Sequence, residues 1–250
     1  MGMLELHGVT KAYDDFTVVE SFSFDVIEGE LRCLLGPNGA GKSTTMDLIT
    51  GRQKLSGGKI VFDGRDITGM KEHEIARLGV GRKFQVPAVF RELTVRENLE
   101  VADNRSPNPF ANMRWFGRSG DSRNFDQIVD LVGLGPRLGT QAGFLSHGET
   151  QWLEIGMVLM QNPKLLLMDE PTAGMTEHEK HKTSEIFGRL KGNHTLVVVE
   201  HDMSFVREIA DVVTVMHLGK LLAEGPMKEI EVNSRVREVY LGSEGNGHDA

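Results

Sequence analysis

A glycine-rich run that fits the phosphate-binding-loop pattern constrains this chain more than any other feature. The pattern Gly-x-x-x-x-Gly-Lys-Ser/Thr is matched by Gly36-Pro37-Asn38-Gly39-Ala40-Gly41-Lys42-Ser43-Thr44. A short apolar segment, 31–35, precedes it with the character of a buried strand, and a helical pattern follows from Thr45 and ends near Gly51. Because strand, loop and helix come in the order that this chemistry needs, the sequence predicts a nucleoside triphosphate site.

The residue types in the loop suit phosphate chemistry. Glycines let backbone N–H groups curl around phosphates, and the following helix N-terminus adds partial positive charge. We expect Lys42 to reach the β- and γ-phosphates and the Ser43 hydroxyl to ligate Mg²⁺. The alternative, a glycine-rich turn that fits by accident, is disfavoured by the flanking patterns.

Two adjacent carboxylates follow a second apolar run. Leu165-Leu166-Leu167-Met168 reads as a buried strand, and Asp169 and Glu170 come directly after it. In open α/β sheets the carboxyl ends of strands face the ligand crevice. We expect Asp169 to hold Mg²⁺ and Glu170 to orient or deprotonate the water that attacks the γ-phosphate. The alternative is that both acids only cap the helix after Pro171.

A second anion site is predicted where another helix begins. Ser146 and Glu149 form a capping box, which explains these two residues without any ligand. It does not explain Gly148, because glycine weakens a first helical turn but permits close backbone approach. Free N–H groups and a serine hydroxyl at such a start can bind an anion.

Composition limits the classes of protein. A chain of 250 residues with 39% hydrophobic content can bury a substantial core, and we expect one nucleotide-binding unit. The formal net charge of −8 argues against nucleic acid as the main partner. Cys33 is the one cysteine, predicted to be a small buried hydrophobe.

The order of elements predicts an α/β fold. Segments 4–9 and 21–27 predict an antiparallel hairpin, and 59–63 adds a strand to the same lobe. From about 87 to 163 the pattern is mainly helical, with a capping box at Thr94 and Glu97. The last third alternates strands (165–168, 195–199, 212–216) with helices (177–190, 203–210), which predicts parallel β-α units.

Leu145 to Glu149, followed by Gln151 and placed shortly before the acidic strand, resembles the signature motif of ATP-binding-cassette (ABC) ATPases. The resemblance covers nearly the whole chain. Carried over by position, it implies that Tyr13 stacks on adenine and that Gln85 links Mg²⁺ and the attacking water to the helical lobe. It also implies that His201 contacts the γ-phosphate.

The resemblance implies a fold and a set of partners. The expected fold is a P-loop cassette with a RecA-like core (about 1–86 and 164–242), an N-terminal antiparallel β lobe, an inserted helical lobe (about 87–163) and a flexible tail (243–250). The cofactors are ATP and Mg²⁺. Two cassettes, homodimeric or from related chains, pair head to tail, so that the signature residues Ser146, His147, Gly148 and Glu149 of one complete the site of the other.

Three positions depart from the usual pattern of the family. His147 stands where many members have glycine, Glu149 where many have glutamine, and Thr176 where the D-loop usually has aspartate. The serine, second glycine, lysine and both acids are present, which predicts a competent ATPase. The departures leave open how the two sites communicate.

Longer strings resemble importer ATPases for hydrophobic amino acids and amides. GRKFQ (81–85) and Trp152 within LSHGETQWLEIGM (145–157) look most like the urea-importer subunit, with the branched-chain amino acid importer close behind. The implied partners are two membrane permeases and a periplasmic solute-binding protein. A soluble ABC ATPase and an exporter-type cassette are the remaining alternatives.

The sequence also predicts where the protein lies in the cell. The first residues lack a signal-peptide pattern, and the apolar runs are far shorter than the roughly 20 residues that span a membrane. We expect a peripheral protein on the cytoplasmic face of a bacterial inner membrane. A polar stretch, 104–124, with Trp115 and Phe116 among arginines reads either as a solvated loop or as a surface that docks on a membrane partner.

Overall fold

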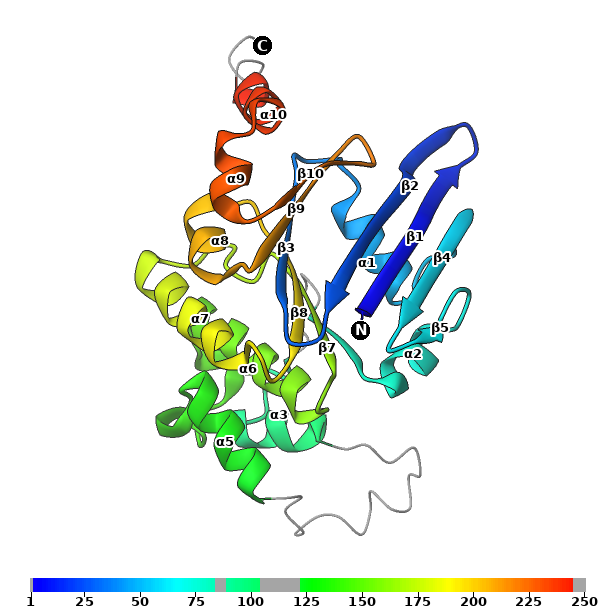
Figure 1. Ribbon diagram of the computed structural model, residues 1–250. Coiled ribbons are helices and arrows are strands. Elements are labelled where there is room, and N and C mark those ends of the chain that lie inside the picture. The colour runs from blue at the N-terminus through cyan, green and yellow to red at the C-terminus, as the bar shows by residue number, and fades with distance from the viewer. Residues whose placement is uncertain (1, 84–88, 104–121, 245–250) are drawn as a thin grey trace.

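The computed structural model describes residues 2–83, 89–103 and 122–244 (Figure 1). A four-stranded antiparallel sheet has the order β2-β1-β4-β5 and consists of β1 (Gly2–Tyr13), β2 (Phe16–Ile27), β4 (Gly57–Phe62) and β5 (Arg65–Asp66). The predicted hairpin is confirmed, since Leu6 pairs with Phe24. Apolar residues at alternate positions of β2, such as Phe22 and Val26, are buried on one face of this sheet.

The second sheet has six strands in the order β10-β9-β3-β8-β7-β6. They are β3 (Leu31–Leu35), β6 (Val80–Lys83), β7 (Leu165–Asp169), β8 (Thr195–Val199), β9 (Val212–His217) and β10 (Lys220–Gly225). All neighbours are parallel except β10, which is antiparallel to β9. The strands predicted from apolar runs are confirmed, whereas β6 and β10 have no such run and were not predicted.

The helices of the described chain are α1 (Lys42–Ile49), α2 (Glu72–Leu78), α3 (Val95–Ala102), α5 (Ser122–Val132), α6 (His147–Met160), α7 (Glu177–Leu190), α8 (Met203–Ile209), α9 (Met227–Val232) and α10 (Ser234–Glu244). Two 3₁₀ turns, η1 (Gly135–Arg137) and η2 (Ala142–Phe144), precede α6. The capping box predicted at Thr94 is confirmed. Because α10 continues to Glu244, it includes the first two residues of the expected tail.

Both faces of the six-stranded sheet are buried. Leu31, Cys33 and Leu35 of β3 pack in one apolar cluster with the helices α6 to α8, while Leu34 packs in a second cluster with α1 and the antiparallel sheet. Figure 1 shows these layers on opposite sides of the strands. Parallel strands covered on both faces carry continuous apolar runs, which is why β7 and β8 were recognisable in the sequence.

Helices α3, α5 and α6 separate β6 from β7 along the chain, although these strands are neighbours in the sheet. Residues 104–121 of the candidate docking surface (104–124) and Gln85 lie outside the described residues. In the part of the chain that the structure describes, none of the helices has the length and apolar character needed to cross a membrane.

Candidate nucleotide site

The predicted phosphate loop connects β3 to α1 at the carboxyl end of the sheet. Gly36 has a φ of 156°, and a Cβ atom there would lie 2.4 Å from the carbonyl oxygen of Met216 on β9, so a side chain does not fit. Asn38 and Gly39 are exposed at the tip of the loop. Packing of the loop against β9 therefore fixes its path while its tip stays open.

Lys42 begins α1 and folds back across the loop. Its Nζ donates hydrogen bonds to the carbonyl oxygens of Gly36 (2.7 Å) and Pro37 (3.1 Å). Burial lowers the pKa of Lys42, and the nearby carboxylates of Glu170 and Asp169 oppose that shift. The ammonium group is thus held by weak neutral acceptors inside the loop, where a phosphate would be a stronger partner.

Asp169 is the last residue of β7 and is almost fully buried. Its Oδ2 lies 3.7 Å from Nη2 of Arg82 on β6, and Arg82 also donates to Oδ1 of Asp47 on α1 (2.6 Å). Burial raises the pKa of Asp169, with Arg82 acting in the opposite direction. The other oxygen, Oδ1, is buried and accepts no hydrogen bond from the described residues.

Glu170 and His201 come from adjacent strands. Glu170 follows β7 with a φ of +47°, a left-handed conformation that costs a non-glycine residue about 1 kcal/mol or more. The Oε1 atom of Glu170 lies 3.8 Å from Nδ1 of His201, whose ring is exposed beyond β8. Strain of this kind at a half-buried carboxylate is typical of a functional position.

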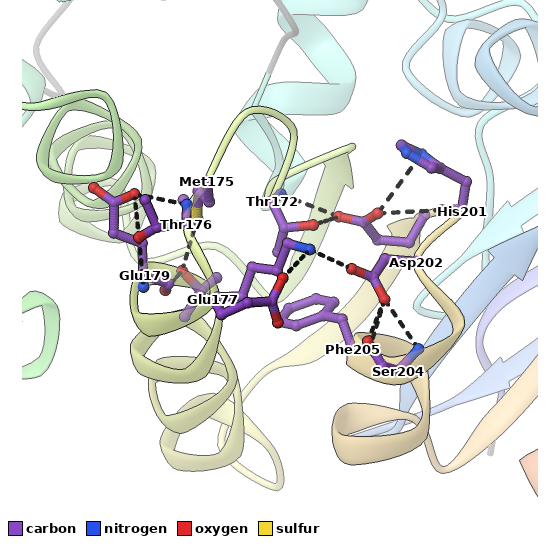
Figure 2. A network of polar contacts seen from close by, with 12 residues as sticks. Thr172, Met175, Thr176, Glu177, Glu179, His201, Asp202, Ser204 and Phe205 are labelled. Carbon is purple, nitrogen blue, oxygen red and sulfur yellow. Dashed lines mark hydrogen bonds and ion pairs between the residues drawn. The ribbon is translucent and has the colours of Figure 1, made fainter.

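A fully buried carboxylate, Glu200, fixes the backbone around these groups. Its Oε1 accepts hydrogen bonds from Thr172 N (3.0 Å) and Thr172 Oγ1 (2.6 Å), and its Oε2 accepts from the His201 backbone N–H (3.1 Å). In Figure 2 the dashed contacts of Thr172 and His201 converge on one carboxylate. The turn after Glu170 and the strand end before His201 are therefore held together.

Asp202 sets the direction of the chain just after His201. It caps α8 (Figure 2) by accepting from the backbone N–H groups of Ser204 (3.0 Å) and Phe205 (3.2 Å). Lys180 Nζ on α7 lies 2.7 Å from its Oδ2. The hydrogen bond from Lys180 holds the pKa of Asp202 well below its usual range. Lys180 in turn has a raised pKa, because it bonds to Asp202 and to Glu177.

Other predicted residues have fewer contacts. Tyr13, at the end of β1, is 45% exposed; its hydroxyl donates to Gln53, and Lys11 Nζ lies 4.5 Å from the ring centre. Ser43 is exposed in the first turn of α1 and Thr44 is half-buried. The structure thus brings Lys42, Asp169, Glu170 and His201 to one edge of the sheet.

The predicted signature residues lie at the start of α6. Ser146 is the N-cap, accepting from Glu149 N (3.2 Å), and Glu149 accepts from Ser146 N (2.9 Å) and from Arg137 (2.9 Å). His147 Nε2 donates to the carbonyl oxygen of Ala173 (2.8 Å) in the turn that precedes α7. The capping box is confirmed, and His147 fastens the motif to the segment after Glu170.

Sequence reasoning missed three residues at these sites. Arg82 was noted only within a string, Glu200 only as a neighbour of His201, and Glu179, which contacts Ser146 and Gly148, was not singled out. Their contacts join separate strands and helices, so no local pattern marks them. The closest signal was the Thr176-x-x-Glu179 spacing of a capping box at the start of α7.

Comparisons with known proteins agree with this geometry. The profile of the ABC transporter family matches residues 19–173. The high-affinity branched-chain amino acid transport ATP-binding protein BraF of Pseudomonas aeruginosa is 34% identical over 249 residues, which is 96% of this chain and 98% of that protein. The probable branched-chain amino acid transport ATP-binding protein LivG of Archaeoglobus fulgidus is 33% identical over 250 residues (98% and 97%).

A solved structure shows the same fold. The ADP conformation of an ATP-binding cassette of an ABC transporter superposes with a TM-score of 0.85 at 32% identity, covering 97% of this chain and 99% of that one. Fold and site together define a nucleotide-hydrolysing P-loop cassette. The chain belongs to the ABC transporter family. It is an ABC ATPase: it binds ATP and couples ATP hydrolysis to transport.

Proposed function

We propose that this chain is the ATPase subunit of an importer for branched-chain amino acids. The observation that carries this proposal is the match over nearly the full length to transport ATP-binding proteins with that name. These relatives back the branched-chain alternative better than the urea prediction made from GRKFQ and Trp152. Urea uptake is the second candidate, because GRKFQ and Trp152 resemble the urea-importer subunit more than the branched-chain subunit.

We assign the catalytic roles from the resemblance to ABC ATPases together with the positions of these residues at the sheet edge. Lys42 binds the β- and γ-phosphates, exchanging its bonds to two backbone carbonyls for charged ones. Glu170 orients the attacking water and takes its proton. His201 contacts the γ-phosphate, and its backbone is set by Glu200. Tyr13 offers its exposed ring to adenine, and the loop 36–44 surrounds the phosphates.

The residues present fit Mg²⁺. The unpartnered buried Oδ1 of Asp169 and the exposed hydroxyl of Ser43 are hard oxygen donors, and Gln85 adds an amide by resemblance. Mg²⁺ usually keeps several waters and takes one or two protein ligands beside the phosphates, so a carboxylate oxygen and a hydroxyl are enough to hold it. When bound, the ion neutralises charge on the phosphates.

The partners follow from the signature motif. A second cassette, identical or related, places its Ser146, His147, Gly148 and Glu149, or their equivalents, against the nucleotide on Lys42 of the first. Two permeases and a periplasmic solute-binding protein complete an assembly in which this chain sits on the cytoplasmic face of the membrane. The helices α3, α5 and α6 belong to the helical lobe that the sequence predicts at about 87–163, between the two segments of the core.

The test is uptake of labelled leucine and labelled urea by cells with and without this chain. We expect loss of leucine uptake on deletion, with no rescue by a Lys42→Ala variant. Loss of urea uptake alone would move the chain to the urea importers. If neither solute were affected, the importer proposal would be wrong, and purification with attached membrane subunits or with ribosomes would separate the remaining classes.

A further inference from the structure

Glu179, the third residue of α7, bonds to two helices at once. Its Oε2 accepts from Thr176 N (2.9 Å) and Thr176 Oγ1 (2.9 Å), which completes the capping box of α7 (Figure 2). Its Oε1 accepts from Ser146 Oγ (3.3 Å) and from the backbone N–H of Gly148 (3.2 Å), at the start of α6. One carboxylate oxygen therefore caps α7, and the other accepts hydrogen bonds from two donors of the signature motif.

The Glu179 carboxylate lies directly against the first turn of α6. A Cβ atom built on Gly148 would lie 2.4 Å from Glu179 Oε1 and 2.5 Å from Glu179 Cδ. The capping box of Ser146 and Glu149 gives no reason for glycine at 148, and glycine weakens a helix by about 1 kcal/mol relative to alanine. Glycine at 148 therefore leaves room for the Glu179 carboxylate against the helix start, and a side chain there would displace it.

Charge at this position is favourable for α6. The first turn of a helix carries unpaired N–H groups and partial positive charge, and therefore attracts an anion. Hydrogen bonds from Thr176 above all, with Ser146 and Gly148, hold the pKa of Glu179 below its usual range, so the group is a carboxylate at neutral pH. An anion of this same chain thus fills the anion site of the signature motif.

We propose that Glu179 is a resident anion that positions Ser146 and Gly148 and must yield these donors to the terminal phosphate of the ATP bound on the partner cassette. The inference rests on the proposed function, in which the signature motif acts in trans. Oε2 keeps its bonds to Thr176 when Oε1 leaves, so the carboxylate can withdraw to the cap of α7. Closure of the cassette pair then requires the phosphate to displace the Glu179 carboxylate from Ser146 and Gly148.

The test uses ATP-driven pairing in a Glu170→Gln background, where bound ATP is not consumed. Glu179→Gln keeps a side chain that can complete a capping box but removes the charge. The matched control is Glu177→Gln, which removes a carboxylate from the same turn that bonds to Lys180 (2.8 Å) and not to the signature motif. Light scattering during ATP titration gives the concentration for half-maximal dimer formation, and Lys42→Ala gives the blank.

We expect Glu179→Gln to lower that ATP concentration about fivefold or more, since removing a like charge at hydrogen-bond distance shifts a binding equilibrium by at least this factor. Glu177→Gln should leave it unchanged. In the chain with Glu170 intact, Glu179→Gln should lower KM for ATP, whereas a packing defect at the signature motif would raise it. Glu179→Asp, which keeps the charge and the helix cap but has a shorter reach, should give an intermediate value.

An unchanged or raised ATP requirement in Glu179→Gln, with the Glu170→Gln parent pairing normally, would overturn this inference alone. If the parent formed no ATP-dependent pair, alone or with its partner chain, the trans arrangement of the proposed function would be wrong, and the inference would fall with it. Circular dichroism on every variant establishes that each comparison is made between folded proteins.

Discussion

Trp152→Phe tests whether the signature helix is fastened to α7 as the structure describes. Trp152 is buried, its Nε1 donates to Thr183 Oγ1 on α7 (2.9 Å), and Lys182 Nζ lies 3.6 Å from the ring centre. Thr183 also donates to the carbonyl oxygen of Glu179 (2.8 Å), so its own donor stays satisfied in the variant. The variant therefore loses one hydrogen bond, part of a cation–π contact and some packing.

The magnitude follows from these losses. A buried neutral hydrogen bond contributes about 1 kcal/mol, a weaker cation–π partner costs about 0.5 kcal/mol, and the void left by the smaller ring costs about 1 kcal/mol. We expect the free energy of unfolding to fall by about 2–3 kcal/mol, which corresponds to about 5–10 °C in Tm for a chain of this length.

Urea unfolding followed by circular dichroism measures the change, with Phe144→Leu as the control. Phe144 is 79% exposed, so its replacement should alter stability by less than about 0.5 kcal/mol. A loss below about 0.5 kcal/mol in Trp152→Phe, equal to that of the control, would refute the reasoning that this ring joins α6 to α7.

Two further variants test the site and its surroundings. Lys42→Ala removes a charged phosphate partner, so Kd for ATP should rise about 10- to 100-fold in calorimetry, and a change below about threefold would contradict the role given to Lys42. Asp202→Asn keeps a good N-cap but loses the ion pair with Lys180, and should cost about 1 kcal/mol at pH 7. Because the folded pKa of Asp202 is depressed, this stability is complete above the unfolded pKa of about 3.9 and is lost as pH falls through the lower folded value. The stability difference between wild type and variant, measured by denaturation, should therefore be smaller at about pH 3 than at pH 7, and a constant difference would contradict the assignment.

Most of the fold could be predicted from local sequence patterns. Apolar runs such as Leu165–Asp169 and Thr195–Val199 are recognisable because a parallel strand buried on both faces has no polar alternation. Capping boxes at Thr94 and Ser146 mark helix starts for the same local reason. The start of α1 was misplaced: the pattern put it at Thr45, but the helix begins at Lys42, directly after the left-handed Gly41.

Contacts that depend on tertiary packing could not be predicted from the sequence. Arg82 meets Asp47 and Asp169 only because β6 lies beside β7 and close to α1. Glu179 reaches Ser146 across 33 positions of the chain. The strand β10 was missed because none of its residues is fully buried and it lacks the apolar run of the inner strands. It lies at the edge of the sheet, beside β9.

ATP hydrolysis by Glu170→Gln tests the central claim most directly, namely that the carboxylate at the end of β7 activates the attacking water. Phosphate release by the purified chain, or by the assembly with its partners, should fall at least about 100-fold, while ATP binding stays within about twofold of the wild type. Glu177→Gln, which alters an exposed carboxylate, should retain full turnover. Hydrolysis at the wild-type rate in Glu170→Gln would contradict the account.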